Sequence, residues 1–371
     1  MSRRVPRSPR YLDLEITSRC NLACTYCYFL DNPGVVYADL PTAAWLDLFD
    51  EFAACRVLHL SFCGGEPLWR DDFAELVDGV VARQMRFDLL TNGSLLTPEL
   101  ARHLRASRRC DMVQVSLDGS HAASHETLRS RGSFAPALAA IELLQSLQLP
   151  VTVRVTIHPG NIEDLPDLAR LLLDDLGLPS FSTNAASPLG DRDKYPPTAL
   201  LGAAQRLRAM QLLAELDRRY PGRILANAGP LAEWKTFHAM EAARLAGQPI
   251  PGRGRLVGCG CVFDRMAVRA DGAYTPCVML PQCVLGQAGQ ESLVDVWQNA
   301  DLLQRMRQRV DIPLSRFAEC HGCPWLESCT GNCPGIAYSL LGEIDRPSPS
   351  ACLQRFVRES AAAGRAFEFS P

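Results

Sequence analysis

Between residues 11 and 183 the sequence alternates short β-branched or apolar runs with longer amphipathic segments. The spacing of apolar residues predicts strands at 11–16, 57–62, 87–90, 112–117, 151–157 and 180–183. Helices are predicted at 41–54, 70–83, 98–106, 134–147 and 162–176. Strands separated by helices of this length imply a parallel sheet. Six such units are too few to close an eight-fold barrel, so we expect an α/β fold, a partial (β/α)6 TIM-like barrel with its active mouth at the carboxyl ends of the strands.

The remainder of the chain is expected to be organised differently. A long helix is predicted at 199–220, followed by a Gly- and Pro-rich bridge. Beyond it the strand–helix alternation disappears and the remaining cysteines lie in loop-like sequence, which predicts a small domain held together by metal rather than by an apolar core. The expected parts are a tail at 1–10, the barrel at 11–220, the bridge at 221–258, the cysteine-rich domain at 259–360 and a tail at 361–371.

Cysteine is the outlier in the composition, with fifteen residues in tight clusters. No export signal precedes them, so a reducing cytoplasm and metal binding are expected rather than disulfides. The net charge of −3 argues against a nucleic-acid partner. The arginine-rich residues 1–10 are not followed by an apolar run, so neither a signal peptide nor a membrane anchor is expected.

The first cysteine cluster follows the first predicted strand with the spacing C-x3-C-x2-C, at Cys20, Cys24 and Cys27. Three thiolates on one short loop can hold three iron corners of a [4Fe–4S] cluster and leave the fourth iron open for a ligand. A three-cysteine zinc site is the alternative, but structural zinc normally takes four protein ligands.

This cysteine loop, together with Gly64-Gly65-Glu66-Pro67 after the second strand, resembles the radical S-adenosylmethionine (SAM) superfamily. The resemblance implies that the open iron binds SAM, whose cleavage yields methionine and a 5′-deoxyadenosyl radical that abstracts hydrogen from a substrate. The two glycines would let the backbone approach the cofactor, and Glu66 would accept from the SAM ammonium. Tyr26 is expected beside the adenine or, alternatively, packed under the loop.

Further SAM contacts are implied by the same resemblance. Ser116 and Asp118 end the fourth predicted strand, point to the same side and match the family's polar SAM-contacting segment. A turn-capping Asp is the alternative reading of this strand end. Arg129 matches a basic residue near the SAM carboxylate, with Arg131 and Arg154 as rivals for that role.

A second run of cysteines has the spacing Cys320-x2-Cys323-x5-Cys329-x3-Cys333, and Cys352 follows after eighteen residues. Paired C-x2-C motifs are common at zinc, so a zinc ribbon is the alternative reading. The five- and three-residue gaps and the distant last cysteine are not typical of such a site.

With the upstream cysteines, this run resembles the SPASM domain of radical SAM peptide and protein maturases. The resemblance implies an outer and an inner auxiliary [4Fe–4S] cluster beside the catalytic one. The implied ligands are Cys320, Cys323, Cys329 and Cys352 for the outer cluster, and Cys259, Cys261, Cys277 and Cys333 for the inner cluster.

Three clusters and one open iron then use eleven cysteines, which leaves out Cys55, Cys63, Cys110 and Cys283. Cys259 and Cys261 are one residue apart, closer than is usual in this family. In extended chain both face one side and can reach one cluster; alternatively only one binds, and Cys283 or the substrate takes the remaining corner. Cys63, directly before the glycines, is expected to be buried.

The SPASM resemblance implies a substrate that is a peptide or protein and a net oxidation of it. We expect a maturase that installs a crosslink or related modification in a ribosomally made precursor peptide. Sulfatase-maturating enzymes place an Asp after the cysteine matching Cys277, but Val278 stands there. A small-molecule radical SAM oxidoreductase and a non-catalytic iron–sulfur electron carrier are further alternatives. No side chain is singled out as the catalytic general base.

The expected partners follow from the same reading. Related maturases carry an N-terminal module that binds the leader peptide, and Cys20 lies too near the start for one to fit. We therefore expect either a separate leader-recognition protein or recognition by the SPASM region itself. A flavodoxin or ferredoxin is the expected reductant, and neither nucleic acid nor a membrane is expected to bind.

Overall fold

The structure is a computed structural model that describes residues 4–27, 37–189, 199–257, 260–365, 367 and 369. The chain folds into two compact units. Unit 1 comprises Met1–Arg154 and Gly260–Gln304, and unit 2 comprises Val155–Cys259 and Arg305–Pro371. This division differs from the expected one, because the start of the cysteine-rich segment forms strands that extend the sheet of unit 1.

The sheet of unit 1 has the strand order β10-β9-β8-β1-β2-β3-β4-β5. Its strands are β1 (Tyr11–Thr17), β2 (His59–Gly64), β3 (Arg86–Thr91), β4 (Cys110–Ser116), β5 (Val151–Ile157), β8 (Arg265–Val268), β9 (Ala273–Thr275) and β10 (Gly286–Gln287). The strands β1 to β5 are parallel, and β8 is parallel to β1 on its other side. The strands β9 and β10 continue the sheet in antiparallel fashion. The predicted α/β class with a parallel sheet is confirmed.

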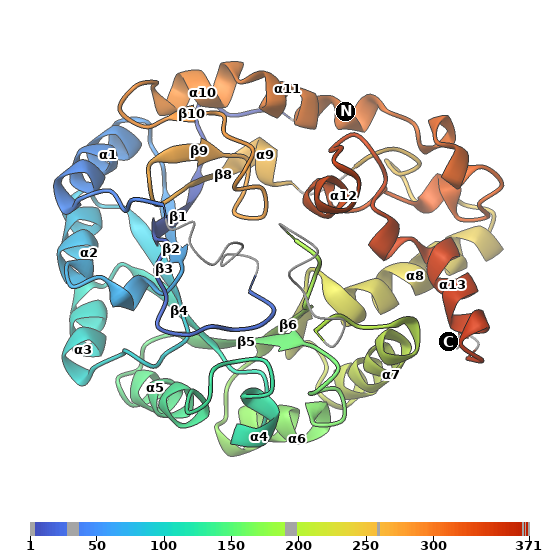
Figure 1. Ribbon diagram of the computed structural model, residues 1–371, viewed down its shortest axis with the longest axis horizontal. Helices are drawn as coiled ribbons and strands as arrows, with labels where there is room; N and C mark the ends of the chain where they lie inside the picture. Colours follow the sequence, from blue (N-terminus) through green and yellow to red (C-terminus); the bar gives the residue numbers. More distant parts are fainter. Residues whose placement is uncertain are drawn as a thin grey trace. The chain divides into compact units, whose positions relative to one another are not determined.

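The two faces of β1 carry different side chains because successive residues of a strand point to opposite sides. Leu12, Leu14 and Ile16 are completely buried. Helices lie along the outside of the strands (Figure 1): α1 (Thr42–Ala54), α2 (Phe73–Ala82), α3 (Pro98–Ser107) and α5 (Phe134–Ser146). Asp13 and Glu15 alternate with the apolar residues and belong to the opposite face, which we call the inner face.

The predicted helices of the first 185 residues are observed with small shifts at their ends. α3 illustrates why its bounds were predictable: the hydroxyl of Thr97 accepts from the Leu100 N–H, and Pro98 occupies the first turn. The helix predicted at 162–176 is interrupted. It consists of α6 (Leu165–Arg170) followed by a π-helical turn at Leu171–Asp175, a short element that apolar spacing does not reveal.

Unit 2 contains the parallel strands β6 (Phe181–Ala185) and β7 (Ile224–Ala226). The helices α7 (Ala203–Arg219), α8 (Gly229–Leu245) and α13 (Leu353–Ala362) build its core. The buried core residues are Leu207, Met210, Phe237, Met240, Leu353, Phe356 and Phe367. The helix α8 lies in the stretch expected to be a bridge. Its Gly and Pro residues gather at the two ends of the helix, where they favour its start and stop, so the average composition of the stretch concealed it.

The rest of the cysteine-rich segment also contains regular structure. Its short helices are α9 (Cys261–Asp264), α10 (Leu293–Asn299), α11 (Asp301–Gln308) and α12 (Pro334–Leu341). A further short helix, α4 (Ala122–His125), lies in unit 1 outside this segment. An apolar cluster of Leu256, Leu314 and Phe317 packs against Cys320 and Cys329. Apolar packing therefore accompanies the cysteines, contrary to the expectation of a metal-held loop region. No helix in the described parts of the chain has the length and apolarity needed to cross a bilayer.

Candidate active site and metal centres

The loop after β1 carries Cys20, Cys24 and Cys27, and the Cys20 thiol interacts electrostatically with the thiols of the other two. Burial, together with the nearby charges of Glu66 and of the two other cysteines, raises the pKa of Cys20 to about 12. Burial likewise raises the pKa of Cys24. Such thiols remain protonated unless a cation binds them, so the loop is suited to a positively charged iron site.

The cysteine loop is tied to the turns at the carboxyl ends of β3 and β4. The Thr25 N–H donates to the Leu128 carbonyl at 2.8 Å. Asn21 Nδ2 donates to Ser94 Oγ at 2.8 Å, and Asn92 Nδ2 donates to Asn21 Oδ1 at 2.9 Å. These bonds connect the loop to two neighbouring strands, so the cysteines are held at the edge where parallel strands end.

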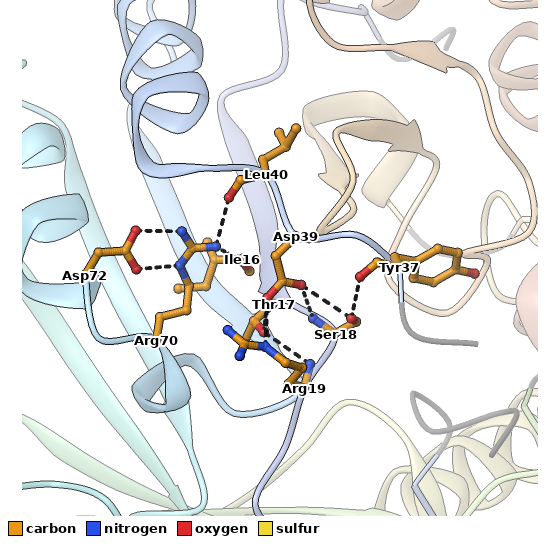
Figure 2. A network of polar contacts seen from close by, with 9 residues as sticks. All are labelled: Ile16, Thr17, Ser18, Arg19, Tyr37, Asp39, Leu40, Arg70 and Asp72. Atoms are coloured by element: carbon orange, nitrogen blue, oxygen red, sulfur yellow. Dashed lines mark hydrogen bonds and ion pairs between the residues drawn. The ribbon is translucent and has the colours of Figure 1, made fainter. Parts of the chain in front are cut away.

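Asp39 fixes the chain directly before the first cysteine (Figure 2). Its Oδ2 accepts from Thr17 Oγ1 at 2.6 Å and from Arg19 Nε at 3.2 Å, and its Oδ1 accepts from the Ser18 N–H at 2.9 Å. Beside it, Arg70 donates to the carbonyl of Ile16 at 2.9 Å. Asp39 and Arg70 therefore hold the end of β1 in place, and neither residue belongs to the cysteine motif.

The glycines after β2 are required by the backbone beside them. A Cβ on Gly64 would lie 2.4 Å from the Thr17 carbonyl oxygen, and one on Gly65 would lie 2.1 Å from the Arg19 carbonyl oxygen. The Gly65 and Glu66 N–H groups donate to these two carbonyls at 2.9 and 2.8 Å. The close approach that the structure shows is thus to the start of the cysteine loop, whereas the sequence suggested an approach to the cofactor.

Glu66 is buried at the end of β2 and accepts three hydrogen bonds. Its donors are Thr91 Oγ1 at 2.6 Å, the Asn92 N–H at 2.8 Å and the Leu68 N–H at 3.1 Å. Burial raises the pKa of Glu66, and these bonds act in the opposite direction. A carboxylate offers about four lone-pair sites, so one remains for a further donor.

Tyr26, Asp118 and Arg129 form one buried network. The Tyr26 hydroxyl and Arg129 Nε both donate to Asp118 Oδ2, and the guanidinium lies 5.5 Å from the centre of the Tyr26 ring. Burial opposes the charge of Arg129, but the Asp118 carboxylate outweighs it and raises the pKa of Arg129. The structure therefore brings three predicted SAM contacts together, and they bind one another.

Ser116 pairs with Arg154 in the register of β4 and β5. Burial alone lowers the pKa of Arg154, whose Nε donates to Gln114 Oε1 at 3.3 Å. Within the described residues no carboxylate forms an ion pair with it. Arg131, the other rival of Arg129, is exposed. Arg154 is thus the half-buried cation beside Ser116 that has no anionic partner.

Four cysteines of the second motif lie around one pocket of unit 2. Cys320, Cys323, Cys329 and Cys352 all line it. Burial, together with the neighbouring charge of Cys329, raises the pKa of Cys320 to about 12. No group of three or more His, Cys, Asp or Glu side chains in the described residues is arranged to hold a single metal ion. Separated thiols fit an iron–sulfur cluster better, because each thiolate binds a different iron.

The cysteines implied for the inner cluster are placed as follows. Cys261 begins α9 and Cys277 follows β9, both in unit 1, while Cys333 precedes α12 in unit 2. Cys259 lies outside the described residues. Cys283, the alternative ligand, is buried. Cys63 is buried on β2 as expected, and burial raises its pKa well above the usual value.

The sequence analysis did not identify two candidate functional residues, Asp39 and Glu15. Asp39 lies in irregular structure, and no motif or spacing marks it. Glu15 had a visible signal, since a carboxylate between the apolar residues of a predicted inner strand of an α/β fold is unusual. It is 2% exposed.

The comparisons with known proteins agree with both motifs. A family model of the radical SAM superfamily matches residues 14–172, and one of the iron–sulfur cluster-binding SPASM domain matches residues 259–324. The mycofactocin maturase MftC of Mycobacterium ulcerans is 31% identical, covering 96% of this chain and 91% of its own. The AdoMet-dependent heme synthase of Methanosarcina barkeri is 27% identical, covering 94% and 97%.

Among solved structures, the fold resembles Streptococcus suis SuiB bound to its precursor peptide SuiA. The TM-score is 0.72, the sequence identity 17%, and the match covers 94% of this chain and 77% of SuiB. At this identity the likeness concerns the fold.

Proposed function

The chain belongs to the radical SAM superfamily and carries its SPASM type of iron–sulfur domain, and from this premise we propose that it is a peptide maturase. Its substrate is a ribosomally made precursor peptide, in which it installs an oxidative modification such as a crosslink. The observation that carries the proposal is the 31% identity to a mycofactocin maturase over almost the whole of both chains.

Cys20, Cys24 and Cys27 would hold the catalytic [4Fe–4S] cluster and leave one iron for SAM. When bound, the cluster and SAM together would supply a 5′-deoxyadenosyl radical that removes a hydrogen atom from the substrate. The hydrogen bonds of the loop to Leu128 and Ser94 keep the three thiols at the carboxyl edge of the sheet.

The SAM contacts are proposed as follows. The free lone pair of Glu66 accepts from the SAM ammonium. Arg154 is half-buried beside Ser116 and has no anionic partner among the described residues, and it binds the SAM carboxylate in place of Arg129. Gly64 and Gly65 hold the chain against the cysteine loop.

Tyr26, Asp118 and Arg129 form the adjoining wall of this site. Their mutual hydrogen bonds fix the side-chain orientations before the cofactor binds. A wall arranged in advance lowers the cost of ordering the site around its ligand.

Two auxiliary [4Fe–4S] clusters complete the proposal. The outer one is held by the four cysteines that share a pocket in unit 2: Cys320, Cys323, Cys329 and Cys352. The inner one is held by Cys259, Cys261, Cys277 and Cys333. The auxiliary clusters supply the electron acceptor that a net oxidation requires. A flavodoxin or ferredoxin in a reducing cytoplasm supplies electrons, and the leader peptide is recognised either by a separate small protein or by the SPASM region itself.

The test is anaerobic co-expression with each short peptide encoded beside this gene, followed by intact and fragment mass spectrometry. A peptide lighter by two hydrogens, with fragmentation blocked between two residues, supports the maturase and locates the bond. Unmodified peptides in the presence of active SAM cleavage would contradict it.

A small-molecule substrate is the second candidate, favoured by the 27% identity to an AdoMet-dependent heme synthase over 94% of this chain. Incubating the reduced enzyme with SAM and iron porphyrins separates the two functions. Product formation from a porphyrin, with every peptide unchanged, would replace the peptide proposal.

A further inference from the structure

Glu15 lies on the inner face of β1, near the carboxyl end of the strand. In the sheet register it stands opposite Cys63 of β2, the residue directly before the two glycines. Its neighbours on the chain, Leu14 and Ile16, point to the helix-covered face. Glu15 therefore belongs to the inner face, two residues before Thr17, the first of the residues that Asp39 binds.

Glu15 differs from the other carboxyl groups that the described residues bury. The buried acids are Glu15, Glu66, Asp118 and Glu241. Glu66 accepts three hydrogen bonds, Asp118 pairs with Arg129, and Glu241 pairs with Arg244. Glu15 has neither an ion pair nor a hydrogen bond within the described residues, and its Oε1 is buried without a partner. A buried carboxyl with an unused oxygen is costly to keep and calls for an explanation.

The charges around Glu15 do not neutralise it. The positive charge of Arg269 lowers the pKa of Glu15, but both its Nε and Nη2 donate to Asp271, at 2.8 and 2.7 Å. Asp13, on the same face of β1, is paired with Arg265 at 2.8 Å.

The pKa of Glu15 is raised to about 8, mainly by burial and also by the charges of Asp13 and Asp271, against the lowering effect of Arg269. A carboxyl with such a pKa exchanges protons near neutral pH, where a general base is most effective. The Cys63 thiol opposite stays protonated, because burial raises its pKa well above the usual value.

We propose that Glu15 is the proton acceptor of the reaction: its unpartnered Oε1 takes the proton that the substrate releases as it is oxidised. The proposal rests on the proposed maturase function, which requires a base.

The balance of the step is simple. A substrate that loses two hydrogens gives up one hydrogen atom to the SAM-derived radical, one electron to an auxiliary [4Fe–4S] cluster, and one proton. The proton forms the O–H bond of the Glu15 carboxylic acid as the substrate's N–H, O–H or C–H bond breaks. The acid then returns its proton to solvent between turnovers.

The test is Glu15→Gln, which keeps the size of the side chain and removes the base. The purified anaerobic holoenzyme should still cleave SAM to 5′-deoxyadenosine in the presence of peptide. Formation of the modified peptide should fall about 100-fold or more, the usual contribution of a general base. Glu15→Asp should recover part of the rate, because a carboxylate is present but one methylene shorter.

The matched control is Asp13→Asn, which removes the other inner-face carboxylate of β1. It should keep product formation and move the acidic limb of the pH–rate profile to lower pH, because the charge of Asp13 helps to raise the pKa of Glu15. A Glu15→Gln enzyme with the wild-type product rate and pH profile would overturn the proposal. Loss of SAM cleavage together with product would also overturn it, since the residue would then serve the cofactor.

A direct readout keeps the proposal testable if no peptide is modified. Infrared difference spectra of the holoenzyme should show one protonated-carboxyl carbonyl band that is present at pH 6, titrates near pH 8 and is missing in Glu15→Gln. If the wild-type enzyme cleaves SAM but modifies no peptide, this result would contradict only the proposal that the substrate is a peptide. Absence of the band at pH 6 would contradict the role of Glu15.

Discussion

Arg129 and Arg154 have different surroundings, and this decides which of them can bind an incoming carboxylate. Arg129 already donates to Asp118, so a second anion would have to displace a buried partner. Removing one member of a buried ion pair costs several kcal/mol. Arg154 is half-buried and donates to the neutral side chain of Gln114. A ligand carboxylate would neutralise the positive charge of Arg154. At Arg129 the same carboxylate would have to compete with Asp118.

Arg154→Gln should therefore weaken SAM binding by about tenfold or more, the value of a charge-assisted hydrogen bond. Anaerobic equilibrium dialysis with labelled SAM measures the dissociation constant, and iron content should be unchanged. Arg131→Gln, an exposed neighbour in sequence to Arg129, is the control and should bind SAM normally. Unaltered affinity in Arg154→Gln would refute the assignment.

Glu15 also predicts how stability depends on pH. Its folded-state pKa is raised to about 8 by burial, so the native state binds the proton more tightly than the unfolded chain. The stability from this group is fully present below the unfolded pKa and is lost as the pH rises toward 8 and beyond. The expected loss is on the order of 2 kcal/mol between pH 6 and pH 8.

Urea unfolding of the anaerobic holoenzyme at these two pH values measures the effect. The Glu15→Gln variant should gain stability relative to the wild type as the pH rises. Parallel changes in the two proteins would show that the carboxyl ionises normally.

At the scale of elements, the cysteine loop and the turn after β2 are built as one piece. Gly65 approaches the Arg19 carbonyl so closely that a methyl group has no space, and the Glu66 N–H bonds to the same carbonyl. The glycines therefore shape the loop that carries Cys20, and through it the iron site.

Gly65→Ala should consequently destabilise the protein by about 2 kcal/mol or more, since backbone must move to accept the methyl group. The thermal midpoint and the iron content of the loop should both fall. Gly202→Ala is the matched control, because its Cβ would meet nothing closer than 3.6 Å. A normal iron content in Gly65→Ala would show that the turn after β2 is not needed for iron binding by the cysteine loop.

The same elements show what sequence reasoning could reach. The strands β1 to β5 were predictable because the spacing of apolar residues and the length of each run both fit a strand. The cysteine motifs were predictable because their residues lie close together in the sequence. The pairing of β8 with β1 was not, because β8 has only four residues and its partner lies some 250 positions away. Asp39 and the network of Tyr26, Asp118 and Arg129 were likewise hidden, since contacts between distant segments leave no periodic pattern.

At the scale of the whole molecule, the cysteines are divided between the two units. Cys20, Cys24, Cys27, Cys261 and Cys277 belong to unit 1, and Cys320, Cys323, Cys329, Cys333 and Cys352 belong to unit 2. The outer set lies entirely within unit 2, next to its apolar core, in which Trp325 and Cys329 pack against the buried cluster. Its metal content should therefore change without affecting the catalytic loop.

Cys352→Ala tests this separation. Three clusters predict about twelve irons per wild-type chain, and the variant should lose about four of them, because Cys352 is one of four thiols around a single pocket. SAM binding should stay at the wild-type level, since the proposed SAM contacts lie in unit 1, while the thermal midpoint should fall as unit 2 loses the proposed metal crosslink. Cys55→Ala, outside every motif, is the control and should keep all the iron. A wild-type iron count in Cys352→Ala would remove the outer cluster from the assignment, and a simultaneous loss of SAM binding would show that the two units depend on each other for their metal sites.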